Sequence, residues 1–291
     1  MLRISIFCIA VFWSWSAIGQ EKTPFATYDF SSDKVYLEKR SALAKESNSI
    51  PQYNAMIRLA IAYKDFETAI RYYSKRIEIE PDNAELHYRL AGVNGIRIDE
   101  ISKFKALPYV FAMKTNFLKA HQLDPTHTPT LTALVRIYTK LPDFLGGDID
   151  KAKNFAKLLS DLSPTEGLLA QGFISESENN TTQAKAQYKS AFEFLPFLDG
   201  CENSSVSGYF ENRSQNLSYE IASIGLAFNL SSTASICALE YYVAQFDAHD
   251  NLPKEWAYYK LALLYEKINE KDQAIQYRSL ALDINPTFNP E

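Results

Sequence analysis

The clearest pattern of apolar and polar positions lies near the C-terminal end of the chain, between residues 254 and 286. Its first half places apolar side chains three and four residues apart, at Tyr258, Leu261, Ala262 and Tyr265. After a polar break at 269–272, a second half repeats this spacing at Ala274, Tyr277 and Ala281, and Pro286 ends it. The spacing predicts two amphipathic helices joined by a short turn. Because one hairpin cannot bury its own apolar face, we expect further copies upstream.

Small residues stand where the backbones of these two predicted helices have to approach closely. The stretch resembles a tetratricopeptide repeat, whose unit of about 34 residues places large, small and proline residues at such offsets. The residues that carry the resemblance are Tyr258, Leu261, Ala262, Tyr265, Ala274, Ala281 and Pro286. Arg278 departs from the pattern, because an aromatic residue is usual at its position.

Five upstream stretches repeat the pattern in order along the chain. They span about 51–81, 84–125, 128–164, 165–196 and 219–246, the last being degenerate. The second and third of these stretches carry extra segments at Gly95–Leu107 and Leu141–Asp148, and a Gly-, Ser- and Asn-rich loop is expected at 197–208. The sequence thus predicts an all-α solenoid of about six hairpins over residues 51–291. Residues 20–50 form an irregular lead and an N-terminal capping helix from about Asp33 to Lys45.

The wider pattern over Ala84–Pro196 is similar to that of secreted bacterial tetratricopeptide repeat proteins. One relative by pattern is the periplasmic helical partner of TRAP-type solute-binding proteins. The resemblance implies binding and assembly, not a defined reaction.

Composition agrees with a helical repeat and restricts the class of partner. The chain has 46% hydrophobic residues and only ten glycines and twelve prolines, which argues against disorder and against a strand-rich fold. The net charge is −5, with acids and bases interspersed and no basic stripe. We therefore do not expect a nucleic acid as partner.

The first nineteen residues are typical of an export signal. Arg3 precedes an apolar run from Ile4 to Ile18, and Ala17 and Gly19 are the small residues that a signal peptidase reads. We expect residues 1–19 to be removed and the protein to be periplasmic or extracellular, with no span left in the membrane. The alternative is a retained membrane anchor.

Cleavage would leave two cysteines, Cys201 and Cys237. In an oxidising compartment two such cysteines can pair. The alternative is a buried free thiol at Cys237, which lies on an apolar helical face.

Motifs that would indicate catalysis or cofactor binding are weak. His121, Asp124 and His127 lie close in sequence, but no further ligand completes a metal shell, so we interpret them as helix-end residues. Gly146, Gly147 and Asp148 fit a turn and a helix cap better than an anion site. Six N-x-S/T triplets would be glycan acceptors in a eukaryotic secretory chain, and we interpret them as a by-product of Asn- and Ser-rich turns. We expect no catalytic residue, metal or cofactor.

The first helices of successive hairpins should line a concave groove. Aromatic side chains with an occasional charge suit a peptide, because they bury area with few rotors to freeze. The groove positions taken by register are Tyr88, Arg136, Phe173, Tyr219, Trp256, Tyr259 and Glu266. The two extra segments carry apolar residues, and we expect Phe104 and Phe144 to form a lip beside the groove that contacts a partner; the alternative is that the segments only cap the core.

These features together predict an exported, non-enzymatic scaffold that binds a protein or peptide of unknown identity. The alternative is a periplasmic ligand-binding or transporter-accessory protein that holds a small apolar molecule. A hydrolase is less favoured, since the sequence has no recognisable nucleophile motif.

Overall fold

The computed structural model describes residues 31–46, 48–211, 213, 215–246 and 252–290. The predicted export signal and most of the predicted lead therefore lie outside the described residues. Within them the chain forms fourteen α-helices, one short 3₁₀ helix and no strand. The prediction of an all-α solenoid is confirmed.

The helices pair in sequence order into six antiparallel hairpins. The first helices of the pairs are α2 (Ile50–Ala62), α4 (Ala84–Glu100), α6 (Thr128–Lys140), α8 (Pro164–Ser177), α11 (Gln215–Phe228) and α13 (Lys254–Lys267). The second helices are α3 (Phe66–Ile79), α5 (Lys103–Leu123), α7 (Ile149–Leu162), α9 (Thr181–Glu193), α12 (Ser232–Gln245) and α14 (Lys271–Ile284). Outside the pairs lie α1 (Lys34–Ala44), the 3₁₀ helix η1 (Asp143–Leu145) and α10 (Asn203–Phe210).

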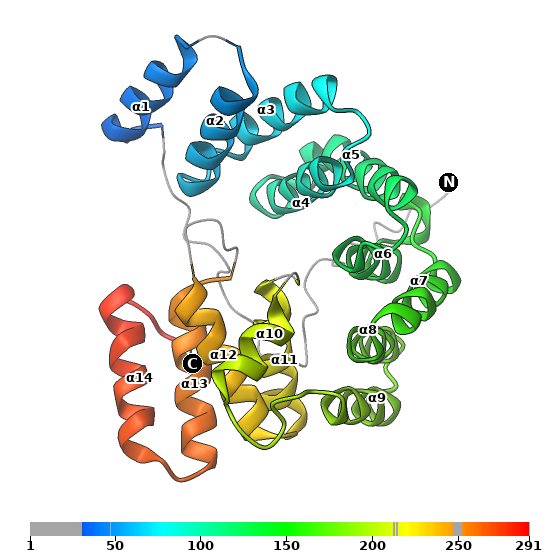
Figure 1. Cartoon of the computed structure of the whole chain (residues 1–291), viewed down its shortest axis with the longest axis vertical. Coiled ribbons are helices and arrows are strands. Elements are labelled where there is room, and N and C mark those ends of the chain that lie inside the picture. Colours follow the sequence, from blue (N-terminus) through cyan, green and yellow to red (C-terminus); the bar gives the residue numbers. More distant parts are fainter. Residues whose placement is uncertain (1–30, 47, 212, 214, 247–251, 291) are drawn as a thin grey trace, which may run out of the picture.

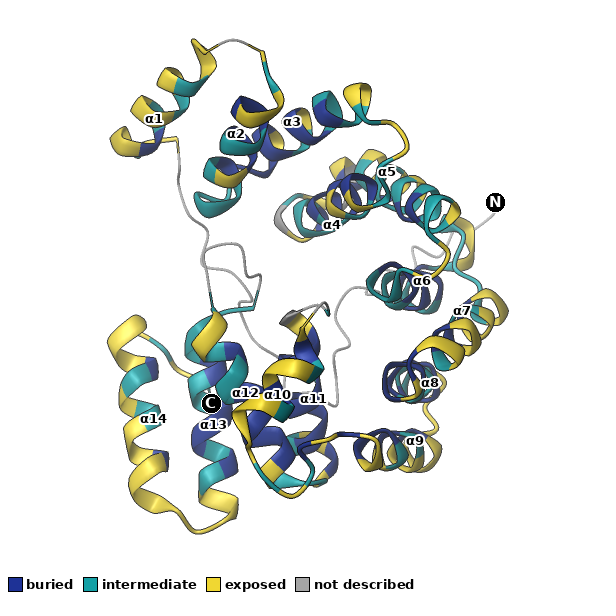
Figure 2. Cartoon of the chain, in the orientation of Figure 1, coloured by how far each residue is buried: buried dark blue, intermediate teal, exposed yellow. Residues whose placement is uncertain are grey.

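The hairpins stack into an arc, with α1 at one end and α14 at the other (Figure 1). The first helices α4, α6, α8 and α11 lie on the inner side, and α5, α7 and α9 lie on the outer side. Colouring by burial shows that exposed positions concentrate on the outer helices and on the two ends (Figure 2). The inner helices are therefore held on several sides, as expected for a repeat array in which each unit contacts its neighbours.

Four of the six hairpin turns share one backbone device. Lys64, Asn179, Asn229 and Asn269 each adopt a positive φ between 54° and 65° just after a first helix. In each turn the next residue donates its backbone N–H to a carbonyl five residues earlier, as Asn180 does to Ser175 at 2.8 Å. This left-handed cap satisfies the last carbonyls of the helix, and asparagine tolerates it better than most residues. The chain can therefore reverse direction with only a few turn residues.

The segment expected as an insertion at Gly95–Leu107 is not a loop. It lengthens the second hairpin, so that α4 has 17 residues and α5 has 21, with Pro108 inside α5. Ile98 and Ala106 are buried in the core, and Glu67 of α3 accepts hydrogen bonds from Arg97 (3.2 Å) and Tyr109 (2.6 Å). The apolar spacing that suggested an insert continues two helices instead.

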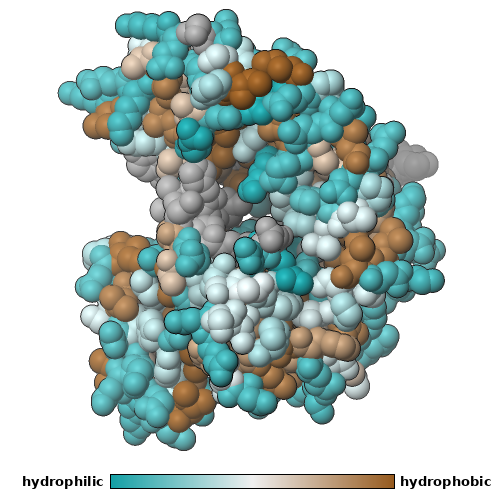
Figure 3. Space-filling model, viewed as in Figure 1, coloured by the Kyte–Doolittle hydropathy of each residue, from teal (hydrophilic) through white to brown (hydrophobic). Residues whose placement is uncertain are grey.

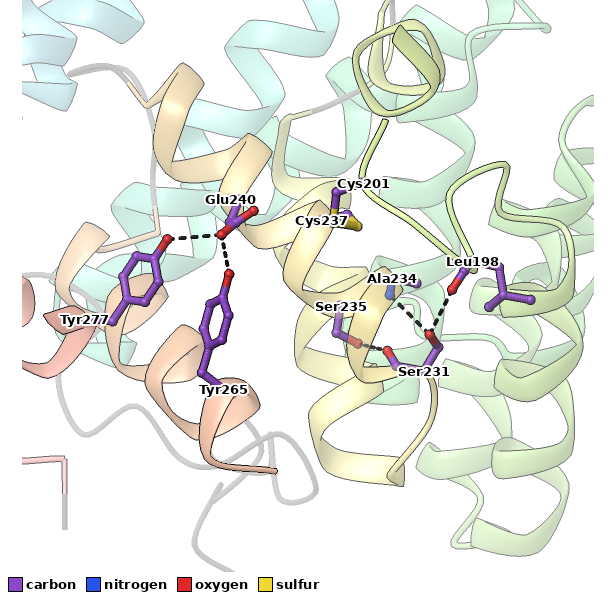
Figure 4. The surroundings of a disulfide bond; sticks show 9 residues. All are labelled: Leu198, Cys201, Ser231, Ala234, Ser235, Cys237, Glu240, Tyr265 and Tyr277. Atoms are coloured by element: carbon purple, nitrogen blue, oxygen red, sulfur yellow. Dashed lines mark hydrogen bonds between the residues drawn. A yellow bond between two sulfur atoms is a disulfide. The ribbon is translucent and has the colours of Figure 1, made fainter. Parts of the chain in front are cut away.

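The segment 197–208, expected to be irregular, is partly helical. It contains most of α10, whose Val206 and Phe210 are buried in the C-terminal core. Cys201 and Cys237 form a disulfide with a Cα–Cα distance of 5.1 Å, which joins this segment to α12 (Figure 4). Ser231 adds a second tie by donating to the carbonyl of Leu198 at 3.2 Å. The glycine- and serine-rich composition predicted a loop where the chain forms the short helix α10.

Candidate functional site

The described residues form a small pocket on the inner side of the arc, where α6, α8 and α11 meet. Its hollow measures about 280 Å³, counting the space open to solvent. Nine residues line it: Thr132, Val135, Arg136, Glu166, Leu169, Ala170, Phe173, Leu217 and Glu220. The space-filling view shows the molecule hollowed between the two ends of the arc (Figure 3). The pocket thus lies in the middle of the concave side.

Arg136 and Glu220 form an ion pair across this pocket. Arg136 Nη2 lies 2.5 Å from Glu220 Oε1, and the guanidinium also lies 5.4 Å from the centre of the Phe173 ring. Because Arg136 belongs to α6 and Glu220 to α11, the pair spans the face of α8 that carries Phe173. Arg136 is more exposed than its partner, with 33% of its side chain accessible against 19% for Glu220. The cation therefore faces solvent and the carboxylate lies beneath it.

Further charged side chains of α6 and α8, Lys140 and Glu176, lie near Arg136 and Phe173. Lys140 Nζ lies 5.0 Å from the centre of the Phe173 ring, and burial lowers the pKa of this lysine. Glu176 accepts a hydrogen bond from the hydroxyl of Tyr188 on α9. Burial raises the pKa of Glu176, although the Tyr188 hydroxyl opposes the shift. Two cations, Arg136 and Lys140, therefore border the Phe173 ring.

A second ion pair involves the segment that precedes α11. Arg213 Nε lies 3.3 Å from Oε1 of Glu166, a carboxylate that is only 7% exposed. The Arg213 guanidinium also lies 4.4 Å from the ring centre of Tyr209 on α10. Burial raises the pKa of Glu166, while Ser163 and Arg213 favour its charged form. We define the concave patch as Arg136, Lys140, Glu166, Phe173, Glu176, Arg213 and Glu220.

Thr132 adds an unsatisfied polar atom to the pocket wall. Its Oγ1 is buried and finds no hydrogen-bond partner among the described residues. Buried hydroxyls are normally satisfied by protein or water. The Thr132 hydroxyl is therefore a buried polar group behind the pocket wall without a partner in the described structure.

Of the predicted groove residues, the structure brings only Arg136 and Phe173 together at the pocket and places the other five elsewhere. Tyr88 packs edge-on against Phe117 and His127, with ring centres 5.8 and 4.9 Å apart. Tyr219 is 2% exposed beneath Lys260, and Trp256 is buried against Phe288. These two rings belong to the core, because neighbouring helices and the segment after α14 cover them.

Tyr259 and Glu266 lie on α13, away from the pocket. The Tyr259 ring contacts Phe288 and Arg278, and Glu266 pairs with Arg278 at 2.9 Å. The exposed pair joins α13 to α14. Arg278, the residue that departs from the repeat pattern, thus has a structural partner.

The structure describes only one of the two side chains that were predicted to form the lip. The Phe104 side chain lies outside the described residues, and Phe144 on η1 is 71% exposed. The two extra segments contribute to one hydrophobic cluster, through Ile98 and Ala106 from one and Leu141 from the other. Lys114 of α5 also donates to the carbonyl of Gly146 at 2.7 Å. The segments therefore help to close the core, and the partner contact of the lip stays a prediction.

Residues considered for metal or anion binding have ordinary structural partners. His121 packs edge-on against Phe155, and His127 Nδ1 lies 2.6 Å from the Thr130 hydroxyl. No group of three or more metal-binding side chains occurs among the residues that the structure describes. Asp148 caps α7 by accepting from the backbone N–H of Lys151 at 3.0 Å.

Sequence reasoning missed Lys140, Glu176, Glu166, Arg213 and Glu220, and the last three form or complete the ion pairs of the patch. Arg213 lies beyond a segment that was interpreted as a loop, and Glu166 and Glu220 occupy helix positions that register alone did not select. A signal was present in the three acids that the first helices α8 and α11 place near their inner faces, Glu166, Glu176 and Glu220. Charged residues at such positions require partners when buried.

The comparisons with known proteins concern the repeat and not the patch. Residues 257–288 match the family model of the tetratricopeptide repeat. A tetratricopeptide repeat protein from Parabacteroides merdae aligns over 86% of this chain and 85% of its own, at 11% identity and a TM-score of 0.44. PilF of Pseudomonas aeruginosa aligns over 88% of this chain and 96% of its own, at 15% identity and a TM-score of 0.40. Curated protein sequences give no match to the chain.

The hairpin at 257–288 repeats along the described chain with the same left-handed turns and the same small residues where helices cross. Ala69, Ala184 and Ala274 are each buried five residues after the positive-φ residue of their turn. None of the described helices combines the length and the hydropathy needed to cross a membrane. The unit at 257–288 thus matches the tetratricopeptide repeat, and the described hairpins upstream share its helix–turn–helix form.

Proposed function

We propose that the protein is an exported, non-enzymatic scaffold that holds a segment of another polypeptide on the concave patch. The tetratricopeptide fold is a scaffold for protein interaction, which supports the general class. The observation that carries the proposal is the layered arrangement at the patch. Partly exposed Arg136 and Arg213 pair with the more buried Glu220 and Glu166, and Arg136 also lies against the Phe173 ring.

This arrangement suits a polypeptide better than a small apolar molecule. Arginine and aromatic side chains dominate the energetics of protein interfaces, because they combine large contact area with directed hydrogen bonds. A peptide supplies carbonyl groups that can meet Arg136, and a side chain that can meet Phe173. A purely apolar ligand would cover the ion pair of Arg136 and Glu220 without offering a hydrogen bond to the remaining donors of the guanidinium. The geometry therefore favours the scaffold over the carrier.

Export is supported by two independent features of the chain. The apolar run Ile4–Ile18 after Arg3 has the composition of a signal segment. Disulfides persist in oxidising compartments, and Cys201 and Cys237 are paired. We expect a mature N-terminus at Gln20 and no thiol that reacts with maleimide before reduction. An intact Met1 in the cytoplasmic fraction, with both thiols reactive, would refute export.

Site-specific photocrosslinking tests the binding surface. Benzoylphenylalanine replaces Phe173 in one variant and, as matched control, Phe111, which is exposed on the outer helix α5. In cells that produce the protein naturally, we expect a defined crosslinked polypeptide from position 173 and none from position 111. A second variant at 173 that also carries Arg136→Glu should lose the product while keeping its helical circular dichroism.

The same experiment tests whether the predicted lip contacts the partner. Benzoylphenylalanine at Phe144 should crosslink the same polypeptide if the 3₁₀ helix borders the binding surface. Crosslinks from 111 and 144 but not from 173 would place the partner on the outer side and would overturn the proposal. Copurification of a small apolar molecule without any crosslinked polypeptide would favour the carrier.

A further inference from the structure

The segment that links α9 to α11 is attached to α12 at two points. Its first part is joined covalently through the disulfide between Cys201 and Cys237 (Figure 4). At the end of α10 the ring of Phe210 stacks on Tyr241 of α12, with ring centres 4.8 Å apart. Cys237 and Tyr241 are four residues apart and so lie on one face of α12. The two attachments therefore hold α10 along that face.

Most of this segment is exposed. Among residues 199–211 only Val206 and Phe210 are buried. Phe210 also packs against Phe197, with ring centres 5.6 Å apart. A helix of eight residues is too short to be stable on its own in water. The position of α10 therefore depends on the disulfide before the helix and on two buried side chains within it.

The end of α10 in turn positions Arg213 at the concave patch. Arg213 Nη1 donates to the carbonyl of Tyr209, and the guanidinium lies 4.4 Å from the centre of the Tyr209 ring. From this position Nε lies 3.3 Å from Oε1 of Glu166, which lines the pocket and is only 7% exposed. Leaving a buried carboxylate without its cation is costly. The charge balance of the pocket therefore depends on where α10 ends.

We propose that the Cys201–Cys237 disulfide positions Arg213 against Glu166, and that its reduction lowers the affinity of the concave patch for a polypeptide. The second part rests on the proposed function. Cys201 is exposed, so a dithiol reductant can reach the bond from solvent. The dithiol transfers two electrons and two protons, so that the disulfide becomes two thiols and the dithiol becomes a disulfide. With only its two buried side chains as anchors, α10 then opens more often, and Arg213 leaves Glu166 with it.

Side-chain NMR of the arginines tests the positioning without any partner. In the ¹⁵N-arginine-labelled mature chain, the Nε–H signal of Arg213 is assigned by its loss in the Arg213→Lys variant. After reduction with dithiothreitol, this group should exchange with water at least about ten-fold faster, because local opening limits the exchange of a protected group. The internal control is the Nε–H of Arg76, which donates to Glu80 at 3.0 Å. It should stay within about two-fold, since hairpins of an array contact only their neighbours. An unchanged rate at Arg213 overturns the positioning.

Partner capture tests the effect on affinity. Four proteins carry benzoylphenylalanine at position 173: the original chain and Arg213→Ala, each with the disulfide and with Cys201→Ser/Cys237→Ser. Loss of the disulfide should lower the yield of crosslinked polypeptide at least about five-fold when Arg213 is present, and by less than about two-fold in Arg213→Ala, because coupled groups are not additive. Circular dichroism checks that all four proteins keep their helices.

The pattern across the four proteins separates positioning from a general loss of stability. Equal losses of yield in both backgrounds would mean that the disulfide acts through stability alone, and would overturn the proposal. An unchanged yield without the disulfide would overturn the effect on affinity. If none of the four proteins forms a crosslink, the proposed function fails and the effect on affinity fails with it. The exchange rate at Arg213 still decides the positioning in that case.

Discussion

Gly172 lies where α8 and α9 approach most closely, and its replacement tests the packing of the array. A Cβ built on Gly172 would lie 2.2, 2.5 and 2.7 Å from Cε1, Cδ1 and Cζ of the Tyr188 ring. That ring is fully buried, and its hydroxyl is held by Glu176. The ring therefore cannot move aside without disturbing both the core and the concave patch.

The magnitude follows from two opposing effects of Gly172→Ala. Alanine in a helix interior is favoured over glycine by about 1 kcal/mol. Overpacking of a close-packed core typically costs about 1–3 kcal/mol. Gly92 in α4 is the matched control, since no heavy atom lies within 4 Å of the Cβ that alanine would add there. Because both substitutions share the helix-propensity gain, the difference between them isolates the steric cost.

We expect Gly92→Ala to stabilise the protein by about 1 kcal/mol and Gly172→Ala to fall about 1–3 kcal/mol below it. Urea denaturation followed by circular dichroism measures both. Hydrogen exchange should show the loss mainly in α8 and α9, because hairpins in an array contact only their neighbours. Equal stability of the two variants would refute the close approach of α8 and α9.

Three further changes probe other parts of the molecule. Cys201→Ser/Cys237→Ser, or reduction, should lower the free energy of unfolding by about 4 kcal/mol for a separation of 36 residues, measured by urea denaturation with and without dithiothreitol; an unchanged midpoint would contradict the pairing. Glu166 has a raised pKa in the folded state, so its contribution to stability is complete below its ordinary pKa of 4.5 and decreases as the pH rises through the raised value. The Glu166→Gln variant should therefore gain stability relative to the original between pH 4 and pH 7, and a relative loss would contradict the burial of the carboxyl. Asp65→Ala removes the cap of α3 and the acceptor of the Tyr36 hydroxyl, so it should cost about 2–4 kcal/mol, whereas Asp148→Ala removes mainly a cap and should cost about 1 kcal/mol in the same assay.

The hairpins could be predicted from the sequence because their determinants are local. Leu261 and Ala262 on one helix and Ala274 and Ala281 on the next stand at offsets that only a close helix crossing explains, and all four are buried. The order of the hairpins then follows from their spacing along the chain. The predicted helix bounds of the second hairpin were wrong, because the apolar spacing at 95–107 is the same in an inserted helix and in a lengthened one.

The concave patch could be predicted only in part, because it depends on the curvature of the array. Register alone placed Arg136, Phe173, Tyr219 and Trp256 on the inner sides of their helices. Whether an inner position is open is decided by the next hairpin and by segments outside the repeat. Phe288 follows the last helix and covers Trp256, with ring centres 5.1 Å apart. Arg213 reaches Glu166 across 47 residues of sequence, a distance that no local pattern encodes.

The position of the concave patch in the arc makes the ion pair of Arg136 and Glu220 sensitive to the curvature of the array. α8 belongs to two hydrophobic clusters, since Leu169 packs with the C-terminal one while Ala170 and Ile174 pack with the central one. The two halves of the arc therefore meet at α8, where Phe173 projects into the patch. Arg136 lies in the hairpin before α8 and Glu220 in the hairpin after it, so a change in curvature alters the distance between them directly. A partner that binds across Phe173 must then either keep this curvature or separate the pair, and the cost of leaving the less exposed Glu220 without its cation opposes separation. The free energy of binding and the shape of the arc are thereby coupled through one ion pair.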